Sequence, residues 1–347
     1  MRKTLKAYCE RPFNRLKIDS DGSYHSCCHQ STKYGNVLTE SRTLEEVFSS
    51  AKIKEVKKSV LNPFLHSTCK NKTCPYFLSS LERTKEVEIS KYPTDLEIAL
   101  PSTWCNIGGL EPTPDTACIM CPRSSMSYMD SLPKEDNTDK ILEFIKPAMP
   151  TLKVLSILGI AEPFFKGKIF EIFDKLDYKR YKENIWFWTF TNGTIFSPQH
   201  QDLFIDHYTH NHSLGFSLDA ATAETYKKIR RIDSFKTTNR NLERYFNKVN
   251  KIQPKQHYSY TTYNINLLNL HEMVQMLRFS HNIGVTKVQF NPTYIPVPGI
   301  KLNREMILNE RNWQRFWDKQ LEVEQLAETL GVELEFYRPF HGGFLNK

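Results

Sequence analysis

The chain has 347 residues, of which 39% are hydrophobic and 25% are charged, and these proportions are typical of a globular protein. Its formal net charge is +8, but the lysines are scattered and the densest group, KIKEVKK at 52–58, has the pattern of a solvent-facing helix. We therefore expect no nucleic-acid partner. The sequence lacks a run of eighteen apolar residues and a secretory signal, so we expect a cytoplasmic protein with no membrane partner.

The cysteines are confined to the first part of the chain. All eight lie within the first 121 residues. In a reducing compartment, metal or cluster ligands and buried thiols are more common than disulfides. The cysteines fall into two sets, Cys9, Cys27, Cys28, Cys69 and Cys74 in the first and Cys105, Cys118 and Cys121 in the second.

Up to about residue 90 the sequence predicts a small α+β unit. RLKIDSDGSYHSCC predicts two strands joined by a turn at Asp21 and Gly22. A loop and a helix follow over 35–61, and Thr43 with Glu46 has the spacing of a capping box at the helix start. The segment HSTCKNKTCPYF then adds the closing pair of thiols.

Beyond residue 95 the pattern alternates between buried strands and amphipathic helices. We expect strands at 95–100, 152–158, 185–191, 213–219, 257–265, 285–292 and 332–337. We expect helices at 167–176, 198–208, 223–231, 238–251, 270–284 and 303–330. This alternation predicts an α/β fold with a parallel sheet and covering helices, either open or curled into a barrel.

Three thiols are expected at one end of this sheet. Cys105 follows the first strand directly, and Cys118 and Cys121 follow after a loop. In parallel α/β folds, ligands bind beyond the carboxyl ends of the strands. Three thiolates can hold a zinc ion or a four-iron cluster while leaving one coordination position open.

The segment CIMCPRS at 118–124 resembles the cluster loop of the radical S-adenosylmethionine (radical SAM) enzymes, in which three cysteines follow the first strand. The family has three residues between the first two cysteines, and this chain has twelve. The resemblance implies a partial (β/α)6 TIM-like barrel. It also implies a 4Fe-4S cluster on Cys105, Cys118 and Cys121, with S-adenosylmethionine on the fourth iron and Met120 beside it.

Further motifs resemble this family in the expected order. LGIAEPFF at 158–165 resembles the motif that meets the amino group of S-adenosylmethionine, and TFTNGTIF at 189–196 resembles the family's Thr-Asn-Gly turn. GFSLDAATAETYKKIRR at 215–231 resembles the ribose-binding strand and a helix whose arginine, Arg230 or Arg231, meets the methionine carboxylate. NLHEM follows the fifth strand. The cofactor-binding residues implied are Gly159, Ala161, Glu162, Asn192, Ser217, Asp219, Arg230 and Asn269.

The spacing of Cys9, Gly22 and Cys27 resembles the opening of SPASM and twitch domains, which hold an auxiliary iron–sulfur cluster. The implied ligands of an auxiliary 4Fe-4S cluster are Cys9, Cys27, Cys69 and Cys74, with Cys28 as an alternative to Cys27. Such domains normally follow the radical SAM domain, whereas this one precedes it. Four thiolates also suit tetrahedral zinc, which stays an alternative.

These features together predict three units and an activity. The units are a SPASM/twitch-like domain at 1–90, a radical SAM barrel at 91–300, and a C-terminal helix and strand extension at 301–347 that packs on the barrel. The resemblance implies reductive cleavage of S-adenosylmethionine and hydrogen abstraction from a peptide or protein, with flavodoxin or ferredoxin as reductant. The alternatives are a small-metabolite or RNA substrate, and a non-catalytic zinc or iron–sulfur scaffold.

Overall fold

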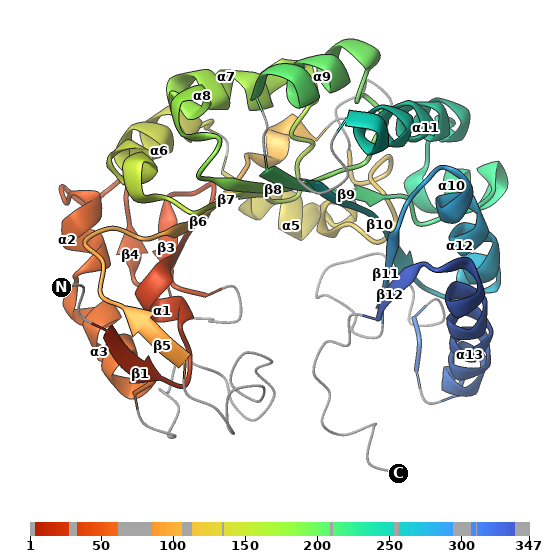
Figure 1. Cartoon of the computed structure of the whole chain (residues 1–347), viewed down its shortest axis with the longest axis horizontal. Helices are drawn as coiled ribbons and strands as arrows, with labels where there is room; N and C mark the ends of the chain where they lie inside the picture. The colour runs from red at the N-terminus through yellow and green to blue at the C-terminus, as the bar shows by residue number, and fades with distance from the viewer. Residues whose placement is uncertain are drawn as a thin grey trace.

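The computed structural model describes residues 4–27, 33–61, 85–105, 113–133, 135–208, 211–252, 257–293, 307–309 and 311–336. These residues form a mixed α/β fold around one long, mostly parallel sheet, with strand order β12-β11-β10-β9-β8-β7-β6-β2-β3-β4. Figure 1 shows the sheet bent into an arc, with the helices along its outer side. In the described part of the chain, every helix is too short or too polar to cross a membrane.

Seven strands follow one another in the sheet in chain order, and each pairs in parallel with the next, as the alternating pattern predicts. They are β6 (Asp95–Ala99), β7 (Val154–Leu158), β8 (Trp186–Thr191), β9 (Asn211–Ser217), β10 (His257–Ile265), β11 (Lys287–Pro292) and β12 (Glu333–Phe336). Their carboxyl ends therefore lie along the same edge of the sheet.

The connecting helices are α5 (Met126–Ser131), α6 (Thr138–Ile145), α7 (Lys168–Lys175), α8 (Tyr178–Tyr181), α9 (Pro198–Asp202), α10 (Ala223–Arg230), α11 (Phe235–Ile252), α12 (Met273–Asn282) and α13 (Trp313–Leu330). A π-helical turn, Leu203–Tyr208, continues α9. The sequence interpretation missed α6, although Ile141, Leu142 and Ile145 have helical spacing and are buried. Helix α13 begins at Trp313 rather than at 303, and residues 303–306 lie outside the described part.

The N-terminal segment extends the same sheet. β2 (Arg15–Ile18) and β3 (Ser23–His25) form the predicted antiparallel hairpin, and Gly22 takes a left-handed φ of +79° in its turn. β4 (Gly35–Asn36) is added beside β3, while β2 pairs in parallel with β6. A separate two-stranded sheet joins β1 (Thr4–Ala7) to β5 (Lys85–Glu88), and α1 (Arg11–Asn14) lies between β1 and β2 in the chain.

The one helix expected after the loop within 35–61 is two helices, α2 (Leu44–Phe48) and α3 (Ala51–Ser59). The predicted capping box of Thr43 and Glu46 starts α2. Ser50 then caps α3, because its side chain accepts a hydrogen bond from the Ile53 backbone N–H at 3.5 Å. A serine that bonds the backbone in this way favours a new helix start over continuation of the first helix.

Buried ion pairs join β2 to β6. The Arg15 guanidinium forms ion pairs with the carboxylates of Asp95, at 3.0 Å, and of Glu97. The Lys17 ammonium nitrogen lies 3.4 Å from a Glu97 carboxylate oxygen. On the opposite face of these two strands, apolar side chains such as Leu96 belong to the main hydrophobic core. The predicted boundary near residue 90 thus falls between two paired strands of one sheet, and the division into three units stays a prediction.

Strand β8 has two different faces. Phe187, Thr189 and Thr191 are buried, whereas Trp186, Trp188 and Phe190 alternate with them and are half-buried. The sequence predicts a wholly buried strand here. The difference arises because helices cover one face of the sheet: Phe187 packs against Phe173 of α7, so the residues that alternate with it lie on the opposite, inner face of the arc in Figure 1.

A histidine is buried at the amino end of β9. The His212 ring nitrogen Nε2 lies 2.9 Å from the Tyr245 hydroxyl, which in turn lies 2.7 Å from the Ser259 hydroxyl. The His257 ring stacks on His212 with its centroid 6.0 Å away. Burial, together with repulsion from His257, lowers the pKa of His212 from 6.5 to about 3.

Because unfolded His212 binds a proton below about pH 6.5 and folded His212 stays neutral, the protein should lose stability as the pH falls from 6.5 towards 3. We expect His212→Gln to reduce this slope, by up to about 1.4 kcal/mol per pH unit. The measurement is urea unfolding at a series of pH values. The exposed residue His281 supplies a control, since His281→Gln should leave the slope unchanged, and equal slopes for wild type and His212→Gln would refute the assignment.

Candidate active site

The three thiols of the predicted cluster loop lie together. Cys105 follows β6 through a short 3-10 turn, Ser102–Trp104, and packs against Cys118, with Cys121 and Ile232 beside them. Cys105 is 9% exposed and Cys118 is 5% exposed. The structure thus brings the three predicted ligands to the carboxyl end of β6, across the twelve-residue gap that separates the first two in the chain.

The surroundings of these thiols contain two buried cations. Burial raises the pKa of Cys105 to about 12 and that of Cys121 to about 11, and it also raises the pKa of Cys118. The positive charge of Arg123 acts in the opposite direction on Cys105 and Cys121, and that of Arg230 does so on Cys118. Buried thiols beside fixed cations suit a bound centre that replaces their protons.

Among the described residues, no group of three or more His, Cys, Asp and Glu side chains converges on a single ion-sized position. Cys105, Cys118 and Cys121 nevertheless pack in one cluster, and three thiols are the donor set that a four-iron cluster with one open iron requires.

Gly159 permits a close approach of two strand ends. Its φ is +121°, and a Cβ at this position would lie 3.1 Å from the backbone nitrogen of Leu100 and 3.2 Å from its carbonyl oxygen. The Leu100 N–H donates to the Leu158 carbonyl at 2.7 Å, which joins the segment before Cys105 to the end of β7. Ala161, two residues on, packs partly buried against the main core.

Glu162 links the ends of β7 and β8. It is 1% exposed, and its carboxylate accepts hydrogen bonds from the Thr191 hydroxyl at 2.7 Å and the Asn192 backbone N–H at 2.8 Å. Burial raises its pKa to about 7, although these hydrogen bonds act in the opposite direction. Asn192 orders the turn further, because its side-chain oxygen accepts from the Thr194 N–H at 2.8 Å. The two predicted motifs thus form one network.

Asp219 and Arg230 form a buried ion pair with their side-chain atoms 2.5 Å apart. Asp219 also accepts hydrogen bonds from the backbone and side chain of Asn264, at 2.7 and 3.0 Å. Arg230 donates to the Ser217 carbonyl at 2.6 Å, and its Nη1 lies 3.9 Å from the Cys118 sulfur. Asn269 is fully buried and donates to the Asp219 carbonyl at 2.8 Å.

The remaining predicted residues lie at the same edge. Ser217 is half-buried, and its hydroxyl accepts a hydrogen bond from Thr262 at 3.2 Å. Met120 is half-buried and packs in a small apolar cluster with Ile119 and Ile229. The sulfur of Met120 also lies 3.5 Å from the side-chain nitrogen of Asn266, so the cluster loop contacts the segment after β10.

Sequence reasoning missed two residues of this edge. Arg123 is 1% exposed, and its place directly after Cys121 and Pro122 was the available signal. Glu272 is 3% exposed and accepts hydrogen bonds from the Ala221 N–H at 2.6 Å and the Thr222 hydroxyl at 2.5 Å. The sequence held no local signal for Glu272, since its partners precede it by about fifty residues.

The predicted auxiliary site is described only in part. Cys9 is half-buried beside a small apolar cluster that contains Ala7, Phe13, Val60 and Val87. Cys27 is buried at the end of the hairpin, 8% exposed. The other members of the first set, Cys28, Cys69 and Cys74, lie outside the described residues.

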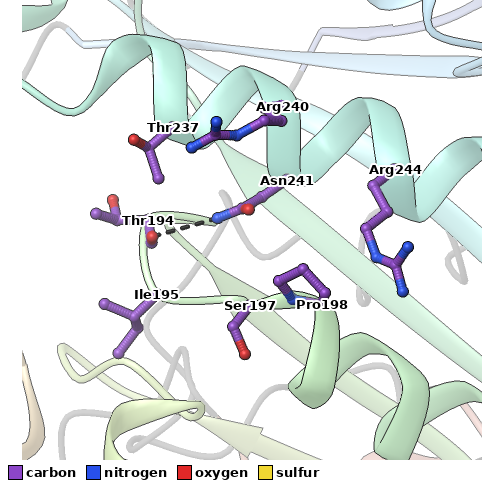
Figure 2. A pocket seen from close by; sticks show the side chains of 8 residues that line it. All are labelled: Thr194, Ile195, Ser197, Pro198, Thr237, Arg240, Asn241 and Arg244. Atoms are coloured by element: carbon purple, nitrogen blue, oxygen red, sulfur yellow. Dashed lines mark hydrogen bonds between the residues drawn. The ribbon is translucent and has the colours of Figure 1, made fainter.

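A surface pocket of about 480 Å³ lies away from the thiols, between the turn after β8 and helix α11. Figure 2 shows Asn241 of α11 reaching this turn, where its side chain donates to the Gly193 carbonyl at 2.8 Å and the Thr194 carbonyl at 3.3 Å. The residues that line the pocket are Thr194, Ile195, Ser197, Pro198, Thr237, Arg240, Asn241 and Arg244. The contact of Asn241 fixes the turn that bears Asn192.

Comparison with protein families identifies the N-terminal segment. Residues 9–75 match the SPASM family model, an iron–sulfur cluster-binding domain. This match confirms the predicted relation to SPASM domains, and its range includes all five cysteines of the first set. Comparison with curated proteins gave no match.

The chain is also similar to solved structures at low identity. SuiB of Streptococcus suis has a TM-score of 0.48 and 12% identity, over 84% of this chain and 61% of SuiB. The protein anSMEcpe with bound AdoMet has a TM-score of 0.46 and 15% identity, over 69% of this chain and 61% of anSMEcpe. SuiB bound to the precursor peptide SuiA has a TM-score of 0.47 and 12% identity, over 97% and 73% of the two chains. This chain thus spans less than two thirds of the first SuiB structure.

Gly159→Ala tests the close approach of β6 and β7. We expect it to lower the free energy of unfolding by about 1–3 kcal/mol, because the backbone conformation and the contact with Leu100 both oppose a Cβ. Gly331 supplies a matched control, with a φ of +67° and nothing within 4 Å of an added Cβ, so Gly331→Ala should cost only about 1 kcal/mol. Urea unfolding measures the free energy of unfolding of both variants. Equal decreases would show that the close contact with Leu100 does not contribute to the cost of Gly159→Ala.

Proposed function

We propose that the chain is a radical SAM enzyme, in which Cys105, Cys118 and Cys121 hold a 4Fe-4S cluster with one iron open to S-adenosylmethionine. The observation that supports this most is the packing of two buried thiols and the half-buried Cys121 at the carboxyl end of a parallel strand. When bound, the cluster would supply the electron that splits the sulfonium, so that the 5′-deoxyadenosyl radical formed can take a hydrogen atom from the substrate.

The chain's own residues would bind and orient the cofactor. Gly159 allows the end of β7 to approach Leu100, in the segment that leads to Cys105, and Ala161 follows it in the same motif. Glu162 would complement the cofactor's amino group, because a nearby ammonium offsets the cost of burying the carboxylate. The turn at Asn192 and the half-buried Ser217 complete the edge of the proposed site.

Asp219, Arg230 and Asn269 are assigned a different role from the direct cofactor contact expected from the sequence. Asp219 bonds Arg230 and Asn264, and Asn269 bonds the Asp219 carbonyl, while Arg230 also lies against the Cys118 sulfur. We propose that they position these strand ends around the ribose and the methionine carboxylate. Met120 would act in the same way, through its packing against the segment after β10.

The proposed substrate is a peptide or protein, and a flavodoxin or ferredoxin is the proposed reductant. The choice of substrate follows from the resemblance to enzymes with SPASM domains, and residues 9–75 match the model of that iron–sulfur cluster-binding domain. Cys9, Cys27, Cys69 and Cys74 are the proposed ligands of the auxiliary 4Fe-4S cluster. The half-buried Trp186, Trp188 and Phe190 on the inner face of β8 offer apolar surface to a substrate side chain.

The test uses anaerobically reconstituted protein with dithionite and S-adenosylmethionine. We expect 5′-deoxyadenosine to form, and the variant with Ala at Cys105, Cys118 and Cys121 to form none beyond background and to bind about four irons fewer. Liquid chromatography with mass spectrometry measures the product, and a colorimetric assay measures the iron. The exposed Ser127 of α5 supplies the control Ser127→Ala, and product formation by the triple variant would refute the proposal.

A further inference from the structure

Twelve residues separate Cys105 from Cys118 in the sequence, so the spacing alone does not specify how far apart the two sulfurs lie. Cys118 and Cys121 are fixed to each other, since the Cys121 N–H donates to the Cys118 carbonyl at 2.9 Å. Among the described residues, contacts with a distant part of the fold connect this pair to the rest of the site.

The end of helix α10 makes these contacts. Each of the consecutive residues Ile229, Arg230, Arg231 and Ile232, referred to below as the α10 end, contacts the segment 114–121 or its thiols. The Ile229 carbonyl accepts a hydrogen bond from the Ile119 N–H at 3.0 Å, and the two isoleucine side chains pack together. Ile232 packs against the buried thiols themselves.

Arg231 binds the turn that precedes Cys118. Its Nη1 donates to the Asp115 carbonyl at 2.6 Å and to the Pro114 carbonyl at 3.3 Å. Hydrogen bonds between Thr113 and Thr116 close this turn, so both carbonyls belong to an ordered unit. Because one guanidinium binds two successive backbone carbonyls, it fixes the orientation of the turn as well as its position.

The backbone of Arg231 gives a second reason to assign a role to its side chain. Arg231 ends α10 with a left-handed φ of +60°, a conformation that favours glycine. A long side chain at this position opposes the local backbone preference. The contacts of the guanidinium with Pro114 and Asp115 offset that cost.

Arg230 connects the same loop to the sheet. Its guanidinium lies 3.9 Å from the Cys118 sulfur through Nη1, and its Nη2 lies 2.5 Å from the Asp219 carboxylate at the end of β9. The Cys118 sulfur in turn lies 4.0 Å from the Arg230 carbonyl. Arg230 therefore links Cys118 to the end of β9. Arg231 links the turn at 113–116 to the end of helix α10.

We propose that Arg231, together with Arg230, is a positioning residue that holds Cys118 beside Cys105 before any metal is bound. The significance of this positioning for catalysis rests on the proposed function, because it presents three preformed ligands to the cluster. In this chain the α10 end replaces the short spacing that would otherwise place the ligands. Without Arg231 the turn at 113–116 separates from α10, and Cys118 becomes accessible.

The first test is alkylation of the metal-free full-length protein by iodoacetamide, followed residue by residue with mass spectrometry. In Arg231→Gly the rate at Cys118 should rise about tenfold or more, because the turn loses its bonds to α10 and opens more easily. The helix itself should keep its stability, since glycine suits a φ of +60°. Arg231→Lys, which retains the positive charge and one donor nitrogen, should restore much of the protection. Labelling of Cys118 at the wild-type rate in Arg231→Gly would overturn the proposal.

Arg240 supplies the matched control, because it is an exposed arginine on the neighbouring helix α11. Arg240→Ala should leave Cys118 labelling unchanged, and a similar increase in this variant would count against a specific role for Arg231.

Reconstitution with ferrous iron and sulfide separates this proposal from the proposed function. Arg231→Gly should bind less iron and give a weaker cluster absorption than wild type, with partial recovery in Arg231→Lys. If wild type binds no cluster while Cys118 labelling still rises in Arg231→Gly, the positioning role stands and the enzyme assignment fails. If Arg231→Gly labels and binds iron as wild type does, the positioning role fails.

Discussion

The buried ion pair of Asp219 and Arg230 is the interaction on which the candidate site most depends. It joins the end of β9 to the end of α10, and through Arg230 it reaches the sulfur of Cys118. Removing one partner of such a pair leaves an uncompensated buried charge, which typically costs about 3–5 kcal/mol. Asn264 also stabilises the Asp219 carboxylate, because its backbone N–H and its side-chain amide donate hydrogen bonds to the other carboxylate oxygen. The pair thereby fixes the relative positions of three segments that are remote in the chain.

The parallel sheet explains why these segments meet. Each strand from β6 to β10 ends at the same edge, and each contributes a short polar segment there. Contacts between neighbouring ends then define the edge, with Gly159 against Leu100 and Glu162 against Asn192. A cofactor at this edge would contact loops from several strands, which is the usual position for chemistry in parallel α/β folds.

Much of this arrangement could be predicted from the sequence, because strand periodicity and turn chemistry are local. The hairpin at Gly22 and the capping box at Thr43 follow from patterns within a few residues, and the alternation of strands with helices predicts the parallel pairing. The three thiols could be assigned to one site because Cys105 directly follows a predicted strand. The match of residues 9–75 to an iron–sulfur domain agrees with the cysteine spacing there.

Side-chain pairing across the fold could not be predicted in the same way. Arg230 could equally have faced a ligand, and only the tertiary structure pairs it with Asp219. Arg231 has no sequence signal for its contact with Asp115, since 116 residues separate them. The parallel pairing of β2 with β6 likewise depends on the buried partners of Arg15, which follow it by about eighty residues. Packing and desolvation in the folded protein determine these side-chain pairings, and local propensity does not.

Electron paramagnetic resonance of the dithionite-reduced, reconstituted protein, recorded with and without S-adenosylmethionine, shows whether the cofactor binds the open iron of the proposed cluster. We expect an iron–sulfur signal that changes shape when S-adenosylmethionine is added. We further expect that in the variant with Ala at Cys105, Cys118 and Cys121 any signal from the auxiliary cluster does not respond. A signal in wild type that S-adenosylmethionine leaves unchanged, or a colourless protein with bound zinc, would contradict the account.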